Sequence, residues 1–110
     1  MSSRATLDDG KLQQMIAPMF ERFLGIQRLI LFGSRARGDY EERSDIDLAI
    51  DAESITDEVW DAIYFYKEEN LDTLLSIDLV WIQRASERLQ QKIKEEGVIL
   101  FERETKPKFD

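Results

Sequence analysis

Two nearby segments indicate the fold: Leu29-Ile30-Leu31-Phe32-Gly33-Ser34 and, ten residues later, Asp45-Ile46-Asp47-Leu48-Ala49-Ile50. The first segment is apolar and strand-forming until it meets the Gly-Ser pair, and the second alternates acidic and aliphatic residues with a period of two. Because residues i and i+2 share one face of a strand, Asp45 and Asp47 are expected to point the same way while the aliphatic residues face the core. The two segments therefore predict two neighbouring strands with a polar loop between them.

The Gly-Ser turn and the paired acids have the chemistry of two halves of a phosphate site. Two carboxylates repel each other unless a cation lies between them, and Mg²⁺ is commonly held by one or two carboxylates together with substrate phosphates. Gly33 lets the backbone approach a phosphate because it has no Cβ, and Ser34 adds a hydroxyl and an amide near the start of a short helix. An EF-hand is excluded because Ala49-Ile50 follow the acids, and a Walker-type loop is excluded because the chain has no Gly-Lys-Ser/Thr.

Two motifs resemble the signature of the DNA polymerase β-like nucleotidyltransferase superfamily, and of its minimal nucleotidyltransferases in particular. They are Gly33-Ser34-Arg35-Ala36-Arg37-Gly38 and Ser44-Asp45-Ile46-Asp47-Leu48-Ala49-Ile50, and the resemblance covers roughly residues 12–101. It implies an α/β (α+β) nucleotidyltransferase fold, with a mixed sheet of about four strands flanked by helices. The whole chain, 1–110, is expected to be a single minimal nucleotidyltransferase domain with a frayed tail at 105–110.

The same resemblance implies a function. Family members use two divalent metal ions, Mg²⁺ or Mn²⁺, to transfer a nucleoside monophosphate from a nucleoside triphosphate to a hydroxyl. ATP is the expected donor, and a small helical HEPN-domain protein, for which such chains act as antitoxins, is the expected partner and acceptor. The residues implied are the catalytic and metal-binding carboxylates Asp45, Asp47 and Asp78, and the nucleotide-binding residues Gly33, Ser34, Arg35 and Arg37.

Composition narrows the function classes independently. With 110 residues, 43% of them hydrophobic, the chain can form one core but not two. Its net charge of −8, from 15 basic and 23 acidic residues, argues against direct binding to a nucleic-acid backbone. Cysteine and histidine are absent, which excludes disulfides, zinc sites built on those residues and a Ser-His-Asp triad. Acid-base chemistry therefore falls to carboxylates, Lys or Tyr.

The sequence also predicts no membrane association. No apolar stretch approaches the roughly 20 residues that cross a bilayer. The polar start Met1-Ser2-Ser3-Arg4 lacks the hydrophobic region of a signal peptide, so a cytoplasmic location is expected.

Hydrophobic spacing and helix-capping residues predict alternating helices and strands. Helices are expected at 9–23, 34–37, 56–70 and 86–96, and strands at 27–32, 45–51, 77–82 and 98–101.

Each candidate residue also has a simpler structural explanation. Asp45 and Asp47 could form a solvated strand face, and Asp78 could protect an edge strand from aggregation. Ser34 could be only a helix N-cap, a role compatible with phosphate binding. The arginines of the turn could pair with the acidic side chains that follow them: Arg35 and Arg37 with Glu41 and Glu42.

The segment Val59-Trp60-Asp61-Ala62-Ile63-Tyr64-Phe65-Tyr66 is apolar on more than one helical face. Core packing is the simpler explanation, but the excess of aromatic area favours a protein contact with Trp60, Tyr64 or Phe65 as anchors. Larger relatives hold the acceptor with an extra helical domain, so a shared site in a homo- or hetero-oligomer is expected here. Two alternatives remain: a non-catalytic module that blocks a helical partner sterically, and a small-molecule (antibiotic) nucleotidyltransferase.

Overall fold

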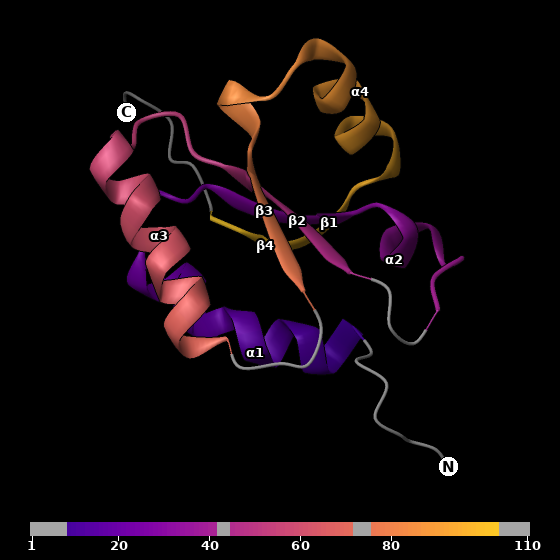
Figure 1. Ribbon diagram of the computed structural model, residues 1–110, viewed down its shortest axis with the longest axis horizontal. Helices are drawn as coiled ribbons and strands as arrows, with labels where there is room; N and C mark the ends of the chain where they lie inside the picture. Colours follow the sequence, from indigo (N-terminus) through magenta and orange to yellow (C-terminus); the bar gives the residue numbers. More distant parts are fainter. Residues whose placement is uncertain (1–8, 42–44, 72–75, 104–110) are drawn as a thin grey trace, which may run out of the picture.

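The computed structural model describes residues 9–41, 45–71 and 76–103. Within these ranges, helices and strands alternate along the chain (Figure 1). The elements are α1 (Asp9–Arg22), β1 (Arg28–Phe32), α2 (Ser34–Arg37), β2 (Ile46–Asp51), α3 (Asp57–Asn70), β3 (Ile77–Trp81), a 3₁₀ turn (Ile82–Arg84), α4 (Glu87–Glu96) and β4 (Val98–Glu102). The predicted tail at 105–110 lies outside the described residues.

The strands form one mixed sheet in the order β3-β2-β1-β4. β1 lies antiparallel to both β2 and β4, whereas β2 and β3 run parallel. A parallel pair needs a long crossover, and α3 supplies it. The predicted mixed sheet of about four strands is confirmed, and the crossover brings the start of β3 beside the start of β2.

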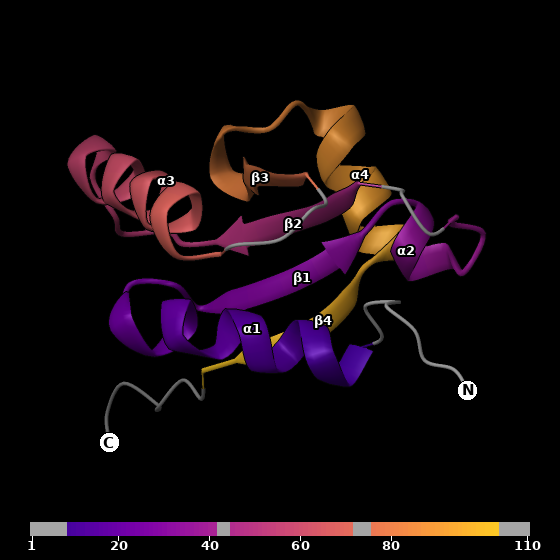
Figure 2. The same cartoon turned by 60° about the horizontal axis from the view of Figure 1, so that its bottom comes forward.

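The helices cover the two faces of the sheet unequally (Figure 2). α1 and α3 pack on one face, where Ile46, Leu48 and Ile50 of β2 are fully buried as the alternation predicts. α4 covers the other face through Ile93, which packs into a smaller cluster with three side chains of β1 and β2: Ile30, Phe32 and Ala49. Because strand side chains alternate, the odd-numbered acids of β2 share this second, less completely covered face.

Local signals explain most of the helix boundaries. Thr56 caps α3 by accepting a 3.2 Å hydrogen bond from the Val59 amide, and Ser86 caps α4 by accepting one of 3.1 Å from the Leu89 amide. Both helix starts agree with the sequence prediction. One strand end does not, because Ile82 begins the 3₁₀ turn instead of ending β3: its carbonyl accepts hydrogen bonds from the Ala85 amide and from Gln90.

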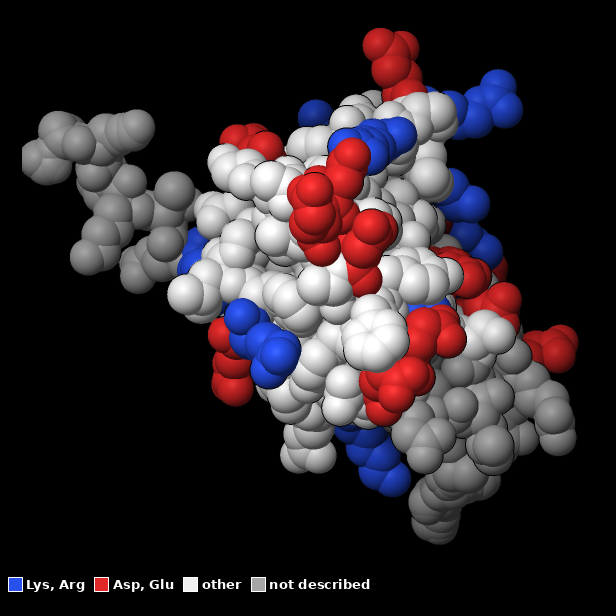
Figure 3. Space-filling view, turned by 60° about the vertical axis from the view of Figure 1, so that its left-hand side comes forward, with Lys and Arg blue, Asp and Glu red and all other residues white. Residues whose placement is uncertain are grey.

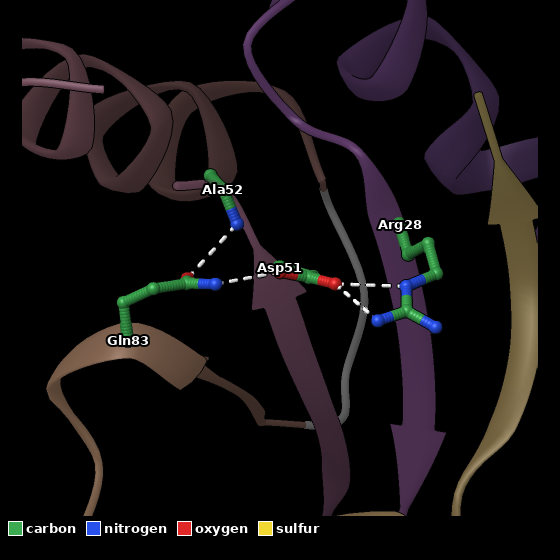
Figure 4. A network of polar contacts seen from close by, with 4 residues as sticks. All are labelled: Arg28, Asp51, Ala52 and Gln83. Atoms are coloured by element: carbon green, nitrogen blue, oxygen red, sulfur yellow. Dashed lines mark hydrogen bonds and ion pairs between the residues drawn. The ribbon is translucent and has the colours of Figure 1, made fainter. Parts of the chain in front are cut away.

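A polar network joins the strand ends opposite the Gly-Ser turn (Figure 4). Asp51, only 7% exposed at the end of β2, accepts hydrogen bonds from Arg28 of β1 at 2.8 Å and from Gln83 at 2.6 Å. The Gln83 amide oxygen in turn accepts a 3.0 Å bond from the Ala52 backbone. The network satisfies a buried charge and fixes β1, β2 and the 3₁₀ turn relative to one another.

None of the helices in the described ranges is long and apolar enough to cross a membrane.

Candidate nucleotide and metal site

The Gly-Ser turn forms a tight connection between β1 and α2. Gly33 has φ +79° and ψ −159°, a region of backbone conformation that is essentially restricted to glycine. Its carbonyl accepts hydrogen bonds from the amides of Ala36 and Arg37, both at 3.0 Å, which closes the single turn of α2. Gly33 occupies the N-cap and Ser34 is the first helical residue, so the structural explanation of Ser34 as the N-cap is wrong.

Gly33 also lies directly against the acid of β2. A Cβ on Gly33 would lie 2.3 Å from Oδ2 of Asp47 and 3.2 Å from its carboxyl carbon. The absence of a side chain at Gly33 therefore makes the space that the Asp47 carboxylate occupies. Gly33 and Asp47 are fourteen positions apart in the sequence, but they form one unit in three dimensions.

The three predicted carboxylates gather at this end of the sheet. Asp47 of β2 and Asp78 of β3 are register partners in the parallel pair, so their side chains leave the same face side by side. Asp45 directly precedes β2 and is exposed, as is Asp78, whereas Asp47 is half-buried. Asp78 joins the group only because the α3 crossover aligns the starts of the two strands.

The acids influence one another electrostatically. Burial raises the pKa of the Asp47 carboxyl above its ordinary value, and the negative charges of Asp78 and Asp45 raise this pKa further. The positive charges of Lys92 and Arg37 oppose the shift without cancelling it. The site thus holds more negative charge than its own cations neutralise.

This arrangement fits a hard divalent cation by its chemistry. The available donors are carboxylate oxygens with surplus negative charge, and Mg²⁺ prefers such donors, usually combining few protein carboxylates with substrate phosphates. Among the described residues, no three acidic side chains converge closely enough to make a ready-formed metal-binding group. The carboxylates suited to hold a cation beside bound phosphates are Asp45, Asp47 and Asp78.

The two arginines of α2 have different environments. Arg35 is only 6% exposed, and its guanidinium lies 4.4 Å from the centre of the Tyr40 ring, a cation–π contact. Arg37 is exposed and forms ion pairs with Asp39 at 3.2 Å and with Glu96 at 3.1 Å. Asp39 and Glu96 raise the pKa of Arg37, so this side chain stays charged beside the site. The guanidinium of Arg35 is thus held over the Tyr40 ring, and that of Arg37 is held by Glu96 of α4.

Sequence reasoning missed the contribution of α4. Glu96 is the α4 residue that reaches Arg37, and Lys92, one turn earlier on the same helix, acts electrostatically on Asp47. In the sequence these residues belong to an ordinary charged amphipathic helix, and no motif distinguishes them. Only the packing of Ile93 onto the sheet places Lys92 and Glu96 beside the Gly-Ser turn.

The aromatic residues of α3 divide into buried and exposed members. Trp60 is half-buried, packs against the core and stacks on Trp81 with ring centres 5.4 Å apart. Trp60 is therefore partly used in core packing, and its role as an anchor stays a prediction. Phe65 and Tyr64 are 66% and 43% exposed, respectively. The apolar surface of α3 is thus centred on Phe65 and Tyr64.

A comparison with protein families identifies one family. A family model described as the polymerase beta nucleotidyltransferase domain matches residues 14–106. No curated protein matches the chain.

Solved structures show the same architecture. A toxin–antitoxin structure with AMP-PNP is 26% identical, with a TM-score of 0.63 over 83% of this chain and 73% of that chain. A structure described as a minimal nucleotidyltransferase is 24% identical, with a TM-score of 0.64 over 86% and 98%. A complex of a tri-AMPylated Shewanella oneidensis HEPN toxin with its MNT antitoxin is 22% identical, with a TM-score of 0.57 over 86% and 73%. The similarity to the last two structures, both under 25% identical, shows a shared fold.

Proposed function

Because this chain belongs to the polymerase beta nucleotidyltransferase family, we propose that it transfers a nucleoside monophosphate, expected to be AMP from ATP, to a protein hydroxyl. The observation that best supports this proposal is the fit between Gly33 and Asp47. A tight glycine turn at the start of α2 and a carboxylate suited to a cation occupy one site, with Asp78 in register beside them. A chain that only blocked a partner sterically would have no use for this arrangement.

In this proposal each side chain has a separate task. Gly33 and Ser34 bind the β- and γ-phosphates through the turn, and the arginines Arg35 and Arg37 add positive charge. The carboxylates Asp45, Asp47 and Asp78 hold divalent cations, Mg²⁺ or Mn²⁺ and two per site by family resemblance. Such ions supply charge neutralisation for the attacking and leaving oxygens.

The reaction is an in-line displacement at the α-phosphorus. The acceptor hydroxyl oxygen forms a bond to this phosphorus, and the bond from phosphorus to the α,β-bridging oxygen breaks with its electron pair leaving on pyrophosphate. The hydroxyl proton passes to a carboxylate, since the chain has no histidine. Positioning and electrostatic stabilisation are expected to supply most of the rate enhancement.

A helical HEPN-like protein is the proposed acceptor and partner, and the chain would act as its antitoxin. One of the similar solved structures, at 26% identity, is a toxin–antitoxin structure with AMP-PNP, which supports the antitoxin role and the use of an adenine nucleotide. The exposed surface of α3 around Phe65 and Tyr64 suits a protein contact. Figure 3 shows this side of the molecule, where acidic side chains lie next to uncharged ones and some Lys and Arg side chains are also present. The acidic side chains would complement basic groups of a partner.

Intact-mass measurement of the partner after co-expression tests the proposal. We expect added AMP on the partner with the wild-type chain and none with the Asp45→Asn/Asp47→Asn double variant, which keeps the shape of the site but removes ligand charge. Both forms should bind the partner equally. An unmodified partner that is bound and inactivated by both forms would instead support the steric module, and nucleotidylation of a free small molecule would support the antibiotic-type activity.

A further inference from the structure

Helix α4 lies on the same face of the sheet as Asp47 and borders the candidate site. Ile93 anchors the helix on the sheet against Ile30 and Phe32, the residue directly before Gly33. Residues four apart lie on the same side of a helix, so Lys92 and Glu96 form one edge of α4. Since Glu96 reaches Arg37 of α2 at 3.1 Å, this edge faces the Gly-Ser turn.

We propose that Lys92 is a phosphate-binding residue: it contacts the β- and γ-phosphates of the bound nucleoside triphosphate and stabilises the departing pyrophosphate. This inference rests on the proposed function and extends it to an element that carries no recognisable motif. Lys92 is exposed, so its ammonium group is accessible to a ligand. Within the described residues, the structure gives it no ion pair that a phosphate would have to displace.

Charge arrangement supports this role. When the bond between the α-phosphorus and the bridging oxygen breaks, the electron pair and the negative charge move onto pyrophosphate. Arg37, already engaged by Asp39 and Glu96, has two carboxylates to neutralise. Lys92 lies one turn before Glu96, the residue that reaches Arg37, so its side chain starts on the edge of α4 that faces the Gly-Ser turn. Its charge is therefore available to the phosphates that gather at this site.

Lys94 provides a matched control on the same helix. It is also exposed, but it lines a cavity of about 420 Å³ together with Arg28, Asp51 and Gln83, at the opposite end of the sheet face from the Gly-Ser turn. Lys92→Met and Lys94→Met remove the same charge from positions two residues apart on one helix. Any general effect of net charge or helix stability should therefore be similar in the two variants.

The test measures binding of ATP, AMP and inorganic pyrophosphate, each with Mg²⁺, by titration calorimetry. For Lys92→Met we expect binding of ATP and pyrophosphate to weaken about tenfold or more, because a charge-assisted phosphate contact is lost, while AMP binding is unchanged. Lys92→Arg should restore most of the affinity, and Lys94→Met should bind all three ligands as the wild type does. In the transfer assay the kcat of Lys92→Met should fall as well, since the lost contact is to the leaving group.

Three results would overturn the inference: unchanged affinity of Lys92→Met for ATP and pyrophosphate, an equal loss for AMP, or the same loss in Lys94→Met. Melting of each variant without ligand shows whether the fold is intact. If the wild-type chain itself binds neither ATP nor pyrophosphate in the presence of Mg²⁺, the proposed function fails together with the inference. A wild-type chain that binds both, with an unaffected Lys92→Met, would contradict only the role of Lys92.

Discussion

Gly33 and Asp47 lie so close together that a side chain at position 33 would displace the Asp47 carboxylate. A Cβ at position 33 would have to pass within 2.3 Å of the Asp47 carboxylate, and the backbone there adopts a conformation that other residues avoid. The same glycine thus serves the backbone turn and the position of the acid.

We expect Gly33→Ala to lower the free energy of unfolding by about 2–4 kcal/mol, from backbone strain plus displacement of Asp47. Gly38→Ala is the matched control, because Gly38 also has a positive φ, +90°, but nothing within 4 Å of a Cβ. Its cost should be limited to about 1–2 kcal/mol of backbone strain. Urea unfolding of both variants measures the difference. If both variants lost the same free energy of unfolding, the Asp47 carboxylate would move aside without cost.

Asp47 should make the stability of the metal-free protein depend on pH. Its pKa in the folded state is raised above the ordinary value of 3.8, so between the two values the folded chain binds more protons than the unfolded chain. Stability contributed by this group therefore falls as pH rises through that window. We expect Asp47→Asn to melt higher than wild type at neutral pH in EDTA, with the advantage vanishing below about pH 3.8. Added Mg²⁺ should reduce the advantage, and a variant that melts below wild type at neutral pH would contradict this explanation.

Asp51, on the same face of the same strand, should respond in the opposite direction. It is buried with partners on both carboxylate oxygens, Arg28 and Gln83. Asp51→Asn removes the ion pair and is expected to lower the free energy of unfolding by about 1–3 kcal/mol. Nucleotide binding should survive in the folded fraction because the network lies at the other end of the sheet. The paired melting curves of Asp47→Asn and Asp51→Asn check both signs in one experiment.

At the scale of elements, α3 combines two kinds of aromatic residue on one helix. Trp60→Ala should lower the free energy of unfolding by about 2–4 kcal/mol, because a half-buried indole stacked on Trp81 is lost. Phe65→Ala should change stability by no more than about 0.5 kcal/mol, since the side chain is 66% exposed. Only the second variant is expected to weaken partner binding at unchanged stability, which thermal melting and a pull-down together measure. If Phe65→Ala bound the partner with wild-type affinity, the contact would not involve Phe65 of α3.

The boundaries of most elements could be predicted because each depends on neighbouring residues. The Gly-Ser turn, the alternation of β2 and the caps Thr56 and Ser86 are all local signals. The position of Asp78 beside Asp47 could be reached only through family resemblance, since the register of a parallel pair depends on a crossover and not on either strand. Lys92 could not be found, because its place beside the site results from how Ile93 packs.

The burial of Trp60 and of Arg35 could not be read from composition either. A helix that is apolar on more than one face does not reveal which face meets the sheet, and the partner of Trp60, Trp81, comes from a strand that follows it in the chain. Arg35 is covered by Tyr40 across the turn of the short helix, whereas an arginine in a polar loop is ordinarily expected to be solvated.

At the scale of the whole molecule, the candidate site is assembled from three separate supports. β1 and the Gly-Ser turn supply one side, α4 supplies the edge that carries Lys92 and Glu96, and the parallel partner β3 supplies the third acid. The network at Asp51 holds the far ends of the strands, so the sheet is fastened opposite the place where the chemistry is expected. The exposed surface of α3 lies on the other helical layer, which leaves the site open to an acceptor.

The parallel pairing of β2 with β3 also has a consequence for the order in which activity and structure are lost. β1 and β2 are antiparallel neighbours in the middle of the sheet, whereas β3 is an edge strand that the chain reaches through the α3 crossover. A partial opening that releases α3 and β3 would remove Asp78 and leave Gly33 and Asp47 together. Such a species would retain much of its sheet but would be inactive. The urea concentration at which catalysis is lost should therefore be lower than the one at which the β1–β2 amides begin to exchange with solvent.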